Sequence, residues 1–339
     1  MSNKDLVIIN NEKISNDNNG FYCDNVDIKT IPESLNKNFK VTLIARSSNN
    51  KRTRQIKLEK IKTSSNIISF LISILKTIKN KEVIHLIISI TPYTFFSYIL
   101  LLFFRKNIFV YLRSNGYEEY KAIFGFIGPA IYHVMFKIMT FRSNIITCQK
   151  RLVKNKKSHM VFPSEIDAMW LENIKKPLLD KPRLLYVGRV KIEKGIFSLL
   201  KIFREITTDI HLSIVGKTES ENLNNEKTSY IGHGYDANEL IKIYDRHNIF
   251  VLPSFTEAHP KVIDESLARG RPVIIFEEIE HIIQDKKGIF VSKRNVKSFL
   301  EIIDFIMKNY TTIQENMNKN KLPTKKNFIS QMENILSSN

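Results

Sequence analysis

Basic and acidic side chains gather at two places in the second half of the chain, each just after a short apolar run. The first place reads Leu-Leu-Tyr-Val-Gly-Arg-Val-Lys-Ile-Glu-Lys-Gly over residues 184–195. Gly188 permits a sharp turn, Arg189 offers paired N–H donors to a phosphate, and Lys194 offers a point charge. A helix expected to start near Gly195 adds free amides. These groups predict a site for a diphosphate that no metal neutralises.

The same segment matches neither of two common nucleotide-binding motifs. It lacks the Gly-Lys-Ser/Thr of a P-loop and the three-glycine spacing of a dinucleotide fold. ATP hydrolysis and dinucleotide binding are therefore not favoured. Taken alone, the segment is equally typical of a surface loop with a glycine turn and two solvated cations.

The second place carries two glutamates with seven residues between them. Glu257 follows an apolar run, and Pro260 precedes a helix in which Glu265 lies about a turn and a half from the start. One carboxylate can face a sugar, and the other can accept hydrogen bonds from ribose hydroxyls. The amides near Lys261 and Val262 then point toward a phosphate. The alternative is that both acids simply favour a helix N-terminus.

The elements that must position these loops follow the pattern of βαβ units. Short runs rich in Ile, Val and Leu alternate with longer segments of helical period, which indicates parallel sheets. The strands expected in the first half are 6–9, 41–45, 83–90, 108–113, 144–148 and 159–162. Those expected in the second half are 184–187, 212–215, 228–231, 249–252, 273–276 and 288–291. The clearest helix follows Ser64 and Ser65 and carries one apolar stripe: Ile67, Ile68, Leu71, Ile72 and Leu75.

Two domains are expected, because 339 residues exceed what one hydrophobic core usually organises. Three prolines interrupt the alternation between residues 163 and 182. We therefore predict a doubly wound, Rossmann-like α/β domain over 1–165, a linker over 166–182 and a second such domain over 183–325. A C-terminal helix is expected over 326–339.

The net charge of +18 calls for an anionic partner. Basic residues cluster over 51–62 and again at Lys150, Arg151, Lys154, Lys156 and Lys157. These clusters are equally typical of a solvated lysine-rich surface. Two distant cysteines indicate neither a disulfide framework nor a zinc site, and no signal-peptide pattern is evident, so we expect a cytoplasmic protein.

Two apolar stretches bear on membrane contact. Residues 93–104 are too short to span a bilayer, and residues 122–141 are interrupted by Pro129, His133 and Lys137. No transmembrane helix is expected, and 93–104 is interpreted as a buried core helix. A helix lying in the interface plane is physically allowed, because apolar faces adjoin basic clusters.

The two loops together resemble the donor site of the retaining glycosyltransferases of family 4, among the glycosyl transferases group 1. The resemblance rests on Gly188-Arg189 with Lys194-Gly195, followed by the Glu257 and Glu265 pair. It is strong over 184–291 and weaker but continuous before. It implies the GT-B fold, in which two Rossmann-like domains face each other across a cleft.

The resemblance also implies roles for single residues. Arg189 and Lys194 would hold the donor diphosphate, Glu257 would contact the transferred sugar, and these three form the implied catalytic set. Glu265 would bind the ribose. The other implied donor-binding residues are Gly188, Gly216, Ile231, His259, Pro260, Lys261 and Val262. A purely structural role is equally compatible with His259.

The first half, which would bind the acceptor, departs from the family's pattern. Many relatives carry a Gly-Gly pair in the first loop, whereas only Gly20 is present here. Many also place a histidine or aspartate after the fourth strand, where this chain has Arg113, Asn115 and Glu118. Gly20 and these three residues are the acceptor-side candidates. Glu118 is equally typical of the first turn of a helix.

The function implied is that of a hexosyltransferase-type glycosyltransferase. It would move a sugar with retention from a UDP- or GDP-sugar to a saccharide or lipid-linked saccharide, in cell-surface polysaccharide or lipopolysaccharide biosynthesis. No metal, other cofactor or nucleic acid is expected, and peripheral contact with an anionic membrane surface is. Two alternatives stay open: a GT-B sugar-nucleotide epimerase, and a basic membrane- or nucleic-acid-binding protein on the same scaffold.

Overall fold

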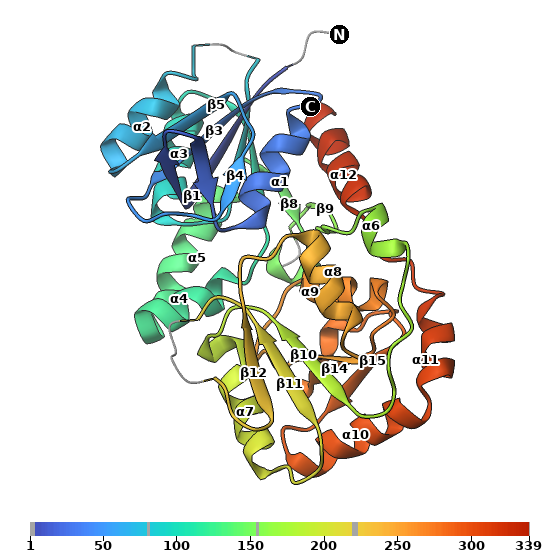
Figure 1. Ribbon diagram of the computed structural model, residues 1–339. Helices are drawn as coiled ribbons and strands as arrows, with labels where there is room; N and C mark the ends of the chain where they lie inside the picture. Colours follow the sequence, from blue (N-terminus) through green and yellow to red (C-terminus); the bar gives the residue numbers. More distant parts are fainter. Residues whose placement is uncertain (1–3, 80–81, 154–155, 219–222, 339) are drawn as a thin grey trace. The chain divides into compact units, whose positions relative to one another are not determined.

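The protein divides into two compact units in the computed structural model, which describes residues 4–79, 82–153, 156–218 and 223–338 (Figure 1). The first unit comprises Met1–Phe162 and Asn327–Asn339, and the second comprises Pro163–Lys326. Each unit is built around one sheet that is wholly or mainly parallel. The expected pair of Rossmann-like α/β units is therefore confirmed.

The sheet of the first unit runs in the order β5-β3-β1-β6-β7-β8-β9, all parallel. Its strands are β1 (Asp5–Asp17), β3 (Lys40–Ser47), β5 (Lys60–Ser64), β6 (Ile84–Ile88), β7 (Asn107–Leu112), β8 (Asn144–Thr147) and β9 (His159–Met160). Two further strands, β2 (Gly20–Cys23) and β4 (Arg54–Ile56), extend it in antiparallel fashion from the far end of β1. Its helices are α1 (Val26–Leu35), α2 (Ile67–Leu75), α3 (Pro92–Phe103), α4 (Gly116–Phe124), η1 (Gly125–Ile127), α5 (Gly128–Met139), η2 (Lys150–Val153) and α12 (Lys325–Ser337).

All six strands predicted in the first half are present, but β2, β4 and β5 were missed. β4 and β5 alternate charged or polar residues with isoleucine, and β2 has only the four residues Gly-Phe-Tyr-Cys, so none of the three carries the Ile-, Val- and Leu-rich run that marks a buried parallel strand. β4 and β5 carry much of the first basic cluster, in which Arg52 pairs with Asp24 at 2.6 Å. Of the second cluster, Lys154 lies outside the described residues.

The two faces of the first sheet carry separate hydrophobic cores. Leu6 and Ile8 belong to one core, and their neighbours Val7 and Ile9 belong to the other, as the alternation of a strand requires. The first core is covered by α1 and α12, where Phe328 lies 6.4 Å from Tyr111 between ring centroids (Figure 1). The C-terminal helix is thus part of the first unit. The second core is covered by α2, α3 and α5.

The apolar stripe predicted on the helix after Ser65 is only partly the face that packs on the sheet, because Leu71 packs against the core but most of the stripe does not. The helix covers 67–75 and starts at the N-cap Asn66, but its buried residues are Phe70 and Ile74, while Ile68 is 69% exposed. Residues 93–104 were expected to form a buried core helix, but only one face of this helix is buried. Tyr98 and Leu101 are buried, while Phe103 is 80% exposed. Apolar residues therefore surround both helices, and only one face of each finds a partner.

The stretch Gly116–Met139 is the only helical segment among the described residues that is long and apolar enough to cross a membrane by length and composition. It is not a single rod. Helix α4 ends at Phe124, Gly125 has a φ of +63°, and α5 begins at Gly128. The two helices pack against each other, with Tyr117 and Tyr132 4.8 Å apart between ring centroids. The segment is a helical hairpin.

The second unit contains a six-stranded parallel sheet in the order β12-β11-β10-β13-β14-β15. Its strands are β10 (Arg183–Val187), β11 (His211–Val215), β12 (Thr228–Gly232), β13 (Ile249–Leu252), β14 (Val273–Phe276) and β15 (Ile289–Ser292), as the sequence predicted. Its helices are α6 (Ala168–Leu171), η3 (Ile192–Lys194), α7 (Ile196–Glu205), α8 (Ala237–Asp245), α9 (Lys261–Ala268), η4 (Glu277–Ile282), α10 (Val296–Lys308) and α11 (Tyr310–Met317). The strand order reverses between β10 and β13, which is the place where open α/β sheets bind ligands.

The proline-rich stretch after residue 163 belongs to the second unit instead of standing apart as a linker over 166–182. The buried guanidinium of Arg269 donates to the carbonyls of Trp170 and Glu172 at 3.0 and 2.8 Å. It also pairs with Asp245 at 2.9 Å. Arg271 donates to the carbonyl of Lys175 at 2.9 Å. These bonds attach the stretch to α8 and to the end of α9.

Candidate functional site

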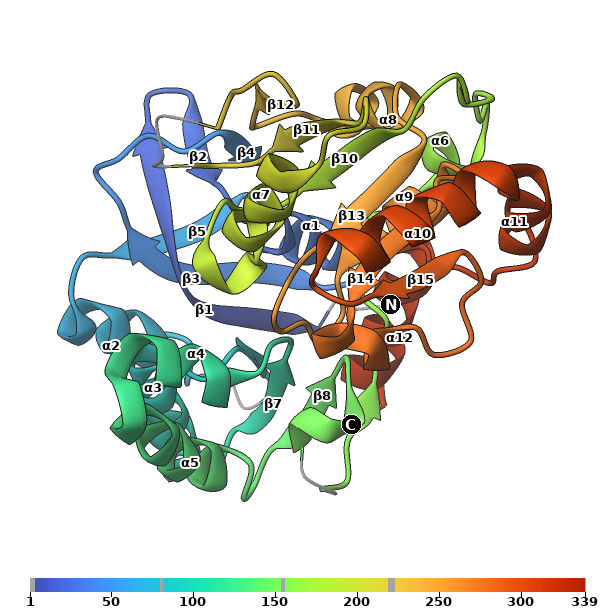
Figure 2. The ribbon, with the colours of Figure 1, turned by 90° about the horizontal axis from the view of Figure 1, so that it is seen from below.

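Two loops meet at the carboxyl ends of β10 and β13, which are neighbours in the second sheet (Figure 2). We call residues 188–195, which connect β10 to α7, the first loop. Residues 253–260, which connect β13 to α9, are the second loop. The two places that the sequence singled out are therefore adjacent in the structure, because parallel strands end at the same edge of a sheet.

The first loop is fixed against the end of β11. The amide of Gly188 donates to the carbonyl of Val215 at 2.9 Å. A Cβ atom on Gly216 would lie 1.7 Å from the carbonyl oxygen of Gly188, so only glycine permits this close approach. The Tyr186 hydroxyl donates to the carbonyl of Arg189 at 2.7 Å. The Arg189 side chain is exposed, and no ion pair involves it within the described part of the chain.

A second glycine brings the two loops into contact. Gly195 has a φ of +67°, and a Cβ atom there would lie 1.8 Å from the carbonyl oxygen of Pro253. The amide of Phe255 donates to the carbonyl of Glu193 at 3.1 Å, which adds a direct bond between the loops. Arg294 stacks 4.3 Å from the ring centroid of Phe255 and donates to the carbonyl of Pro253 at 3.0 Å. The loops therefore form one assembly.

Lys194 and Glu257 join the two loops through their charges. Lys194 Nζ lies 2.6 Å from Glu257 Oε1, and the Ser254 hydroxyl donates to the same oxygen at 2.7 Å. The two charged side chains are 21% and 11% exposed. A half-buried pair of this kind resists screening by salt better than a surface pair. His281 Nε2 donates to the carbonyl of Glu257 at 3.0 Å and holds the backbone of the second loop.

Helix α9 begins at the end of the second loop with Pro260 as its N-cap residue. Pro260 makes no side-chain cap, and the amide of Ile263 donates to the carbonyl of Pro260 at 3.1 Å. That the amides near Lys261 and Val262 bind a phosphate stays a prediction. The ammonium group of Lys261 pairs with Glu165 at 2.9 Å. Val262 is half-buried, and its carbonyl accepts from the Tyr244 hydroxyl at 3.3 Å.

Glu265 lies in the fifth position of α9 and is buried. Burial raises its pKa to about 7, against smaller opposing effects of the Tyr244 hydroxyl and of Lys261. The Tyr244 hydroxyl donates to Glu265 Oε2 at 3.2 Å. This carboxyl therefore titrates near neutral pH, whereas an exposed glutamate is fully ionised there.

Asp264, Lys286 and His259 form a charged cluster at the end of the second loop that the sequence did not reveal. The Asp264 carboxylate is buried and lies 2.6 Å from Lys286 Nζ and 3.3 Å from His259 Nε2. Burial disfavours its ionisation, but the nearby His259 ring and the Lys286 charge outweigh that cost and lower the pKa of Asp264. His259 thus binds within the protein. The sequence does contain one sign of this cluster, because Asp264 is an acid at a buried position of α9, next to Glu265.

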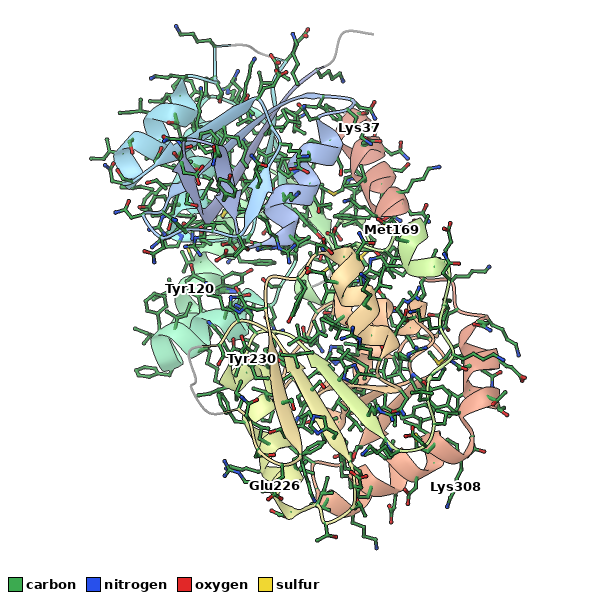
Figure 3. All side chains as sticks on the ribbon, in the orientation of Figure 1. Lys37, Tyr120, Met169, Glu226, Tyr230 and Lys308 are labelled. Atoms are coloured by element: carbon green, nitrogen blue, oxygen red, sulfur yellow. The ribbon has the colours of Figure 1, made fainter. Side chains whose placement is uncertain are left out.

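The remaining donor-side candidates lie at the ends of β11 and β12. The amide of Gly216 donates to the carbonyl of Gly232 at 2.9 Å. Ile231 is half-buried at the end of β12, and its carbonyl accepts from the Tyr235 hydroxyl. Tyr230, labelled in Figure 3, precedes it on the same strand.

The acceptor-side candidates occupy the first unit. Gly20 lies at the turn between β1 and β2 with a φ of +133°, and not in a strand-to-helix loop. Arg113 follows β7, and its guanidinium pairs with Asp27 at 2.7 Å and with Glu12 at 3.4 Å. The remaining two candidates are Asn115, the N-cap residue of α4, and Glu118, an exposed acid in its first turn. The structure therefore gives Asn115 a capping role and engages Arg113 with carboxylates.

Within the described residues, no group of three or more His, Cys, Asp or Glu side chains is arranged to hold a metal ion. The cations Arg189 and Lys194 and the N-terminus of α9 are groups of these loops that suit an anionic ligand.

Comparisons with known proteins bear on the family and the fold of the chain. Residues 171–322 match the family model of glycosyl transferases group 1. The chain is 24% identical over 232 residues to an uncharacterized glycosyltransferase of Haemophilus influenzae, covering 61% of this chain and 63% of that protein. It is 28% identical over 165 residues to the capsular polysaccharide biosynthesis glycosyltransferase CapM of Staphylococcus aureus, covering 44% of this chain and 42% of that protein. The matches thus span less than two thirds of these relatives.

Among solved structures, HepE of Anabaena in complex with UDP and glucose superposes with a TM-score of 0.68. The identity is 11%, and the match covers 98% of this chain and 100% of that chain. At this identity the likeness concerns the fold. The chain thus has the GT-B fold, and residues 171–322, within its second unit, match the glycosyl transferases group 1 model.

Proposed function

We propose that this protein is a glycosyltransferase that takes a sugar from a nucleotide-diphosphate donor. The observation that carries the proposal is the ion pair between Lys194 and Glu257, which joins the first loop to the second. The first loop also carries Arg189, whose side chain is exposed. A cation and a carboxylate at one point suit a donor that presents a diphosphate next to sugar hydroxyls. The group 1 domain over 171–322 supports the same conclusion.

In the proposed reaction the bond between the anomeric carbon and the diphosphate breaks, and the acceptor hydroxyl oxygen bonds to that carbon. Negative charge develops on the departing diphosphate. In this mechanism Arg189, Lys194 and the dipole at the N-terminus of α9 stabilise this charge. The departing phosphate takes the proton of the acceptor hydroxyl on the same face of the sugar, so the configuration is retained without an enzymic base. Glu257 orients the sugar through its hydroxyls.

A UDP- or GDP-sugar is the proposed donor. Glu265 is buried beneath the second loop, and as a carboxylate it would accept hydrogen bonds from ribose hydroxyls. HepE, which shares the fold, is described in complex with UDP and glucose. These points favour a nucleoside diphosphate over other anions, and no metal is invoked.

The proposed acceptor is a saccharide or a lipid-linked saccharide of cell-surface polysaccharide or lipopolysaccharide biosynthesis. CapM is named for capsular polysaccharide biosynthesis, and another relative, from Campylobacter jejuni, is named for transfer to a diphospho-undecaprenol-linked sugar. Such acceptors lie at the cytoplasmic membrane. We therefore also propose a cytoplasmic location with contact to an anionic membrane surface, which the net charge of +18 favours.

Thermal unfolding with UDP, GDP, CMP and ADP tests the donor site directly, because a ligand that binds only the folded state raises the midpoint. A rise with UDP or GDP that is lost in Glu265→Ala is the expected result. Absence of a shift with every nucleotide contradicts the proposal and favours a binding protein on the same scaffold. Incubation with the matching nucleotide sugars then separates the reactions, since an epimerase releases an altered sugar without any acceptor.

A further inference from the structure

One side of the first unit exposes a concentration of large apolar side chains. Among the described residues, 25 large hydrophobic side chains are exposed, and 15 of them lie between residues 67 and 141. They come from α2, α3 and the α4–η1–α5 hairpin. Figures 1 and 2 both show these helices gathered together, and α2 contacts α3, α3 contacts α5, and α5 contacts α4. Members with large exposed fractions include Ile68, Phe96, Phe103, Phe126, Val134 and Phe141. We call this the apolar face.

The hairpin presents the most exposed part of the apolar face at its tip. Phe126 in η1 is 92% exposed, and the neighbouring Ile123 is 68% exposed. No atom lies within 4 Å of a Cβ built on Gly125, so the turn projects into open space. Below the tip, Tyr120 of α4, labelled in Figure 3, packs on Tyr132 of α5 at 5.3 Å between ring centroids. The two packed helices thus hold the apolar side chains of the tip away from the core.

The charges around the apolar face are mainly positive. Residues 67–79, 91–106 and 120–142 contain no aspartate or glutamate, and the acids of the hairpin are Glu118 and Glu119 in the first turn of α4. The three ranges carry six exposed cations: Lys76, Lys79, Arg105, Lys121, Lys137 and Arg142. A second copy of this surface would bring like charges together, whereas an anionic lipid surface complements them. Apolar side chains next to lysine and arginine are the composition of segments that lie in the membrane interface.

We propose that the apolar face, led by the α4–η1–α5 hairpin, inserts into the headgroup and outer acyl region of an anionic phospholipid bilayer. The inference deepens the membrane contact of the proposed function by naming the surface that makes it. Helices of 9 and 12 residues are roughly 14 and 18 Å long, well below the hydrocarbon thickness of about 30 Å. The hairpin therefore enters one leaflet and does not cross.

Co-sedimentation of the full chain with vesicles tests the proposal. Vesicles of phosphatidylcholine with one quarter phosphatidylglycerol should pellet the protein, and pure phosphatidylcholine should pellet much less. Phe126→Ser with Ile123→Ser should lower the partition coefficient by about tenfold or more, because both side chains lose transfer from water. The matched control is Phe305→Ser, which removes an aromatic side chain that is 51% exposed on α10 of the second unit. It should bind as the unchanged protein does.

A second measurement reports insertion itself. In Phe126→Trp the new indole should be quenched by phospholipids brominated in their acyl chains, while the chain's single natural tryptophan, Trp170, is buried and serves as the unquenched reference. Quenching that is absent while the protein still binds vesicles in a salt-sensitive manner overturns the insertion, and leaves attraction by charge alone. Light scattering could also show a dimer that dissociates in the Phe126→Ser/Ile123→Ser variant. That result overturns the insertion, because the apolar face would then bind a second copy of the chain.

The nucleotide-induced rise of the unfolding midpoint separates this inference from the proposed function. The Phe126→Ser/Ile123→Ser variant should keep that rise, since both substitutions lie in the first unit and outside the donor loops. Loss of vesicle binding with an intact UDP or GDP response supports the apolar face. Unchanged vesicle binding in the variant overturns the inference and leaves the donor site as proposed.

Discussion

Lys194 Nζ and Glu257 Oε1 lie 2.6 Å apart, although 62 residues separate the two positions along the chain. The contact depends on two adjacent strands, β10 and β13, and on Gly195, whose missing side chain lets the two loops touch. Each of these features has a consequence that can be measured.

Removing either donor cation should lower transfer sharply. Lys194→Ala and Arg189→Ala are each expected to reduce turnover by about 10²-fold to 10³-fold, because each withdraws a charge from the departing diphosphate. Turnover is measured by release of the nucleoside diphosphate. Lys201→Ala, an exposed lysine on α7, is the matched control and should retain activity. Full activity in Lys194→Ala with an unchanged unfolding midpoint would remove this residue from the mechanism.

Nucleotide affinity should depend on pH through Glu265. Its pKa of about 7 leaves roughly a tenth of the carboxyl ionised at pH 6. Since only the carboxylate accepts hydrogen bonds from both ribose hydroxyls, affinity for UDP or GDP should rise by several-fold to tenfold between pH 6 and pH 8. Titration calorimetry at both values checks this. The rise should vanish in Glu265→Gln, and a rise of equal size in that variant would assign the dependence to another group.

The same pKa predicts how Glu265 affects stability. The folded protein holds this proton up to about pH 7, whereas the unfolded chain releases it near pH 4.5. The free energy of unfolding contributed by Glu265 therefore falls as the pH rises between these values. Urea unfolding of Glu265→Gln should show a flatter pH dependence than the unchanged protein, and higher relative stability at pH 8.

Gly195→Ala should disturb both loops. Its φ of +67° disfavours any side chain, and the new Cβ would approach the carbonyl oxygen of Pro253 to 1.8 Å, so the loops must move apart. We expect a lower unfolding midpoint together with at least about tenfold weaker nucleotide binding, since a displaced Lys194 loses its alignment. Gly234→Ala is the control, because its φ is +86° but its Cβ meets nothing within 4 Å. It should cost about 1 to 2 kcal/mol in stability and leave binding unchanged.

Arg269→Ala should destabilise the second unit. The change leaves Asp245 without this buried partner and frees the carbonyls of Trp170 and Glu172. Breaking a buried pair costs about 3 to 5 kcal/mol, which we expect as a fall of roughly 10 °C or more in the unfolding midpoint. Differential scanning calorimetry measures it. Arg246→Ala removes an exposed arginine next to the same aspartate and should change the midpoint little.

Much of the fold could be predicted because its signals are local. Each buried parallel strand leaves an apolar run, and all twelve runs interpreted as strands are strands in the structure. Of the strands that were missed, β4 and β5 carry charged residues and β2 has only four residues, Gly-Phe-Tyr-Cys. The pairing of β2 and β4 depends on the extension of β1 beyond the main sheet, and that of β5 on the edge of β3, which no local pattern indicates.

The sequence by itself also determined which residue types follow which strands: the cations after β10, the two glutamates around the start of α9, and the glycines at the sharp turns. Only the tertiary structure decided the rest. It placed Lys194 on Glu257, buried Glu265 so that its pKa rises, and brought Lys286 to Asp264. It also packed α12 into the first unit and left most of the stripe of α2 exposed. The physical reason is that burial, charge pairing and pKa depend on which neighbours surround a residue, and those neighbours come from distant parts of the chain.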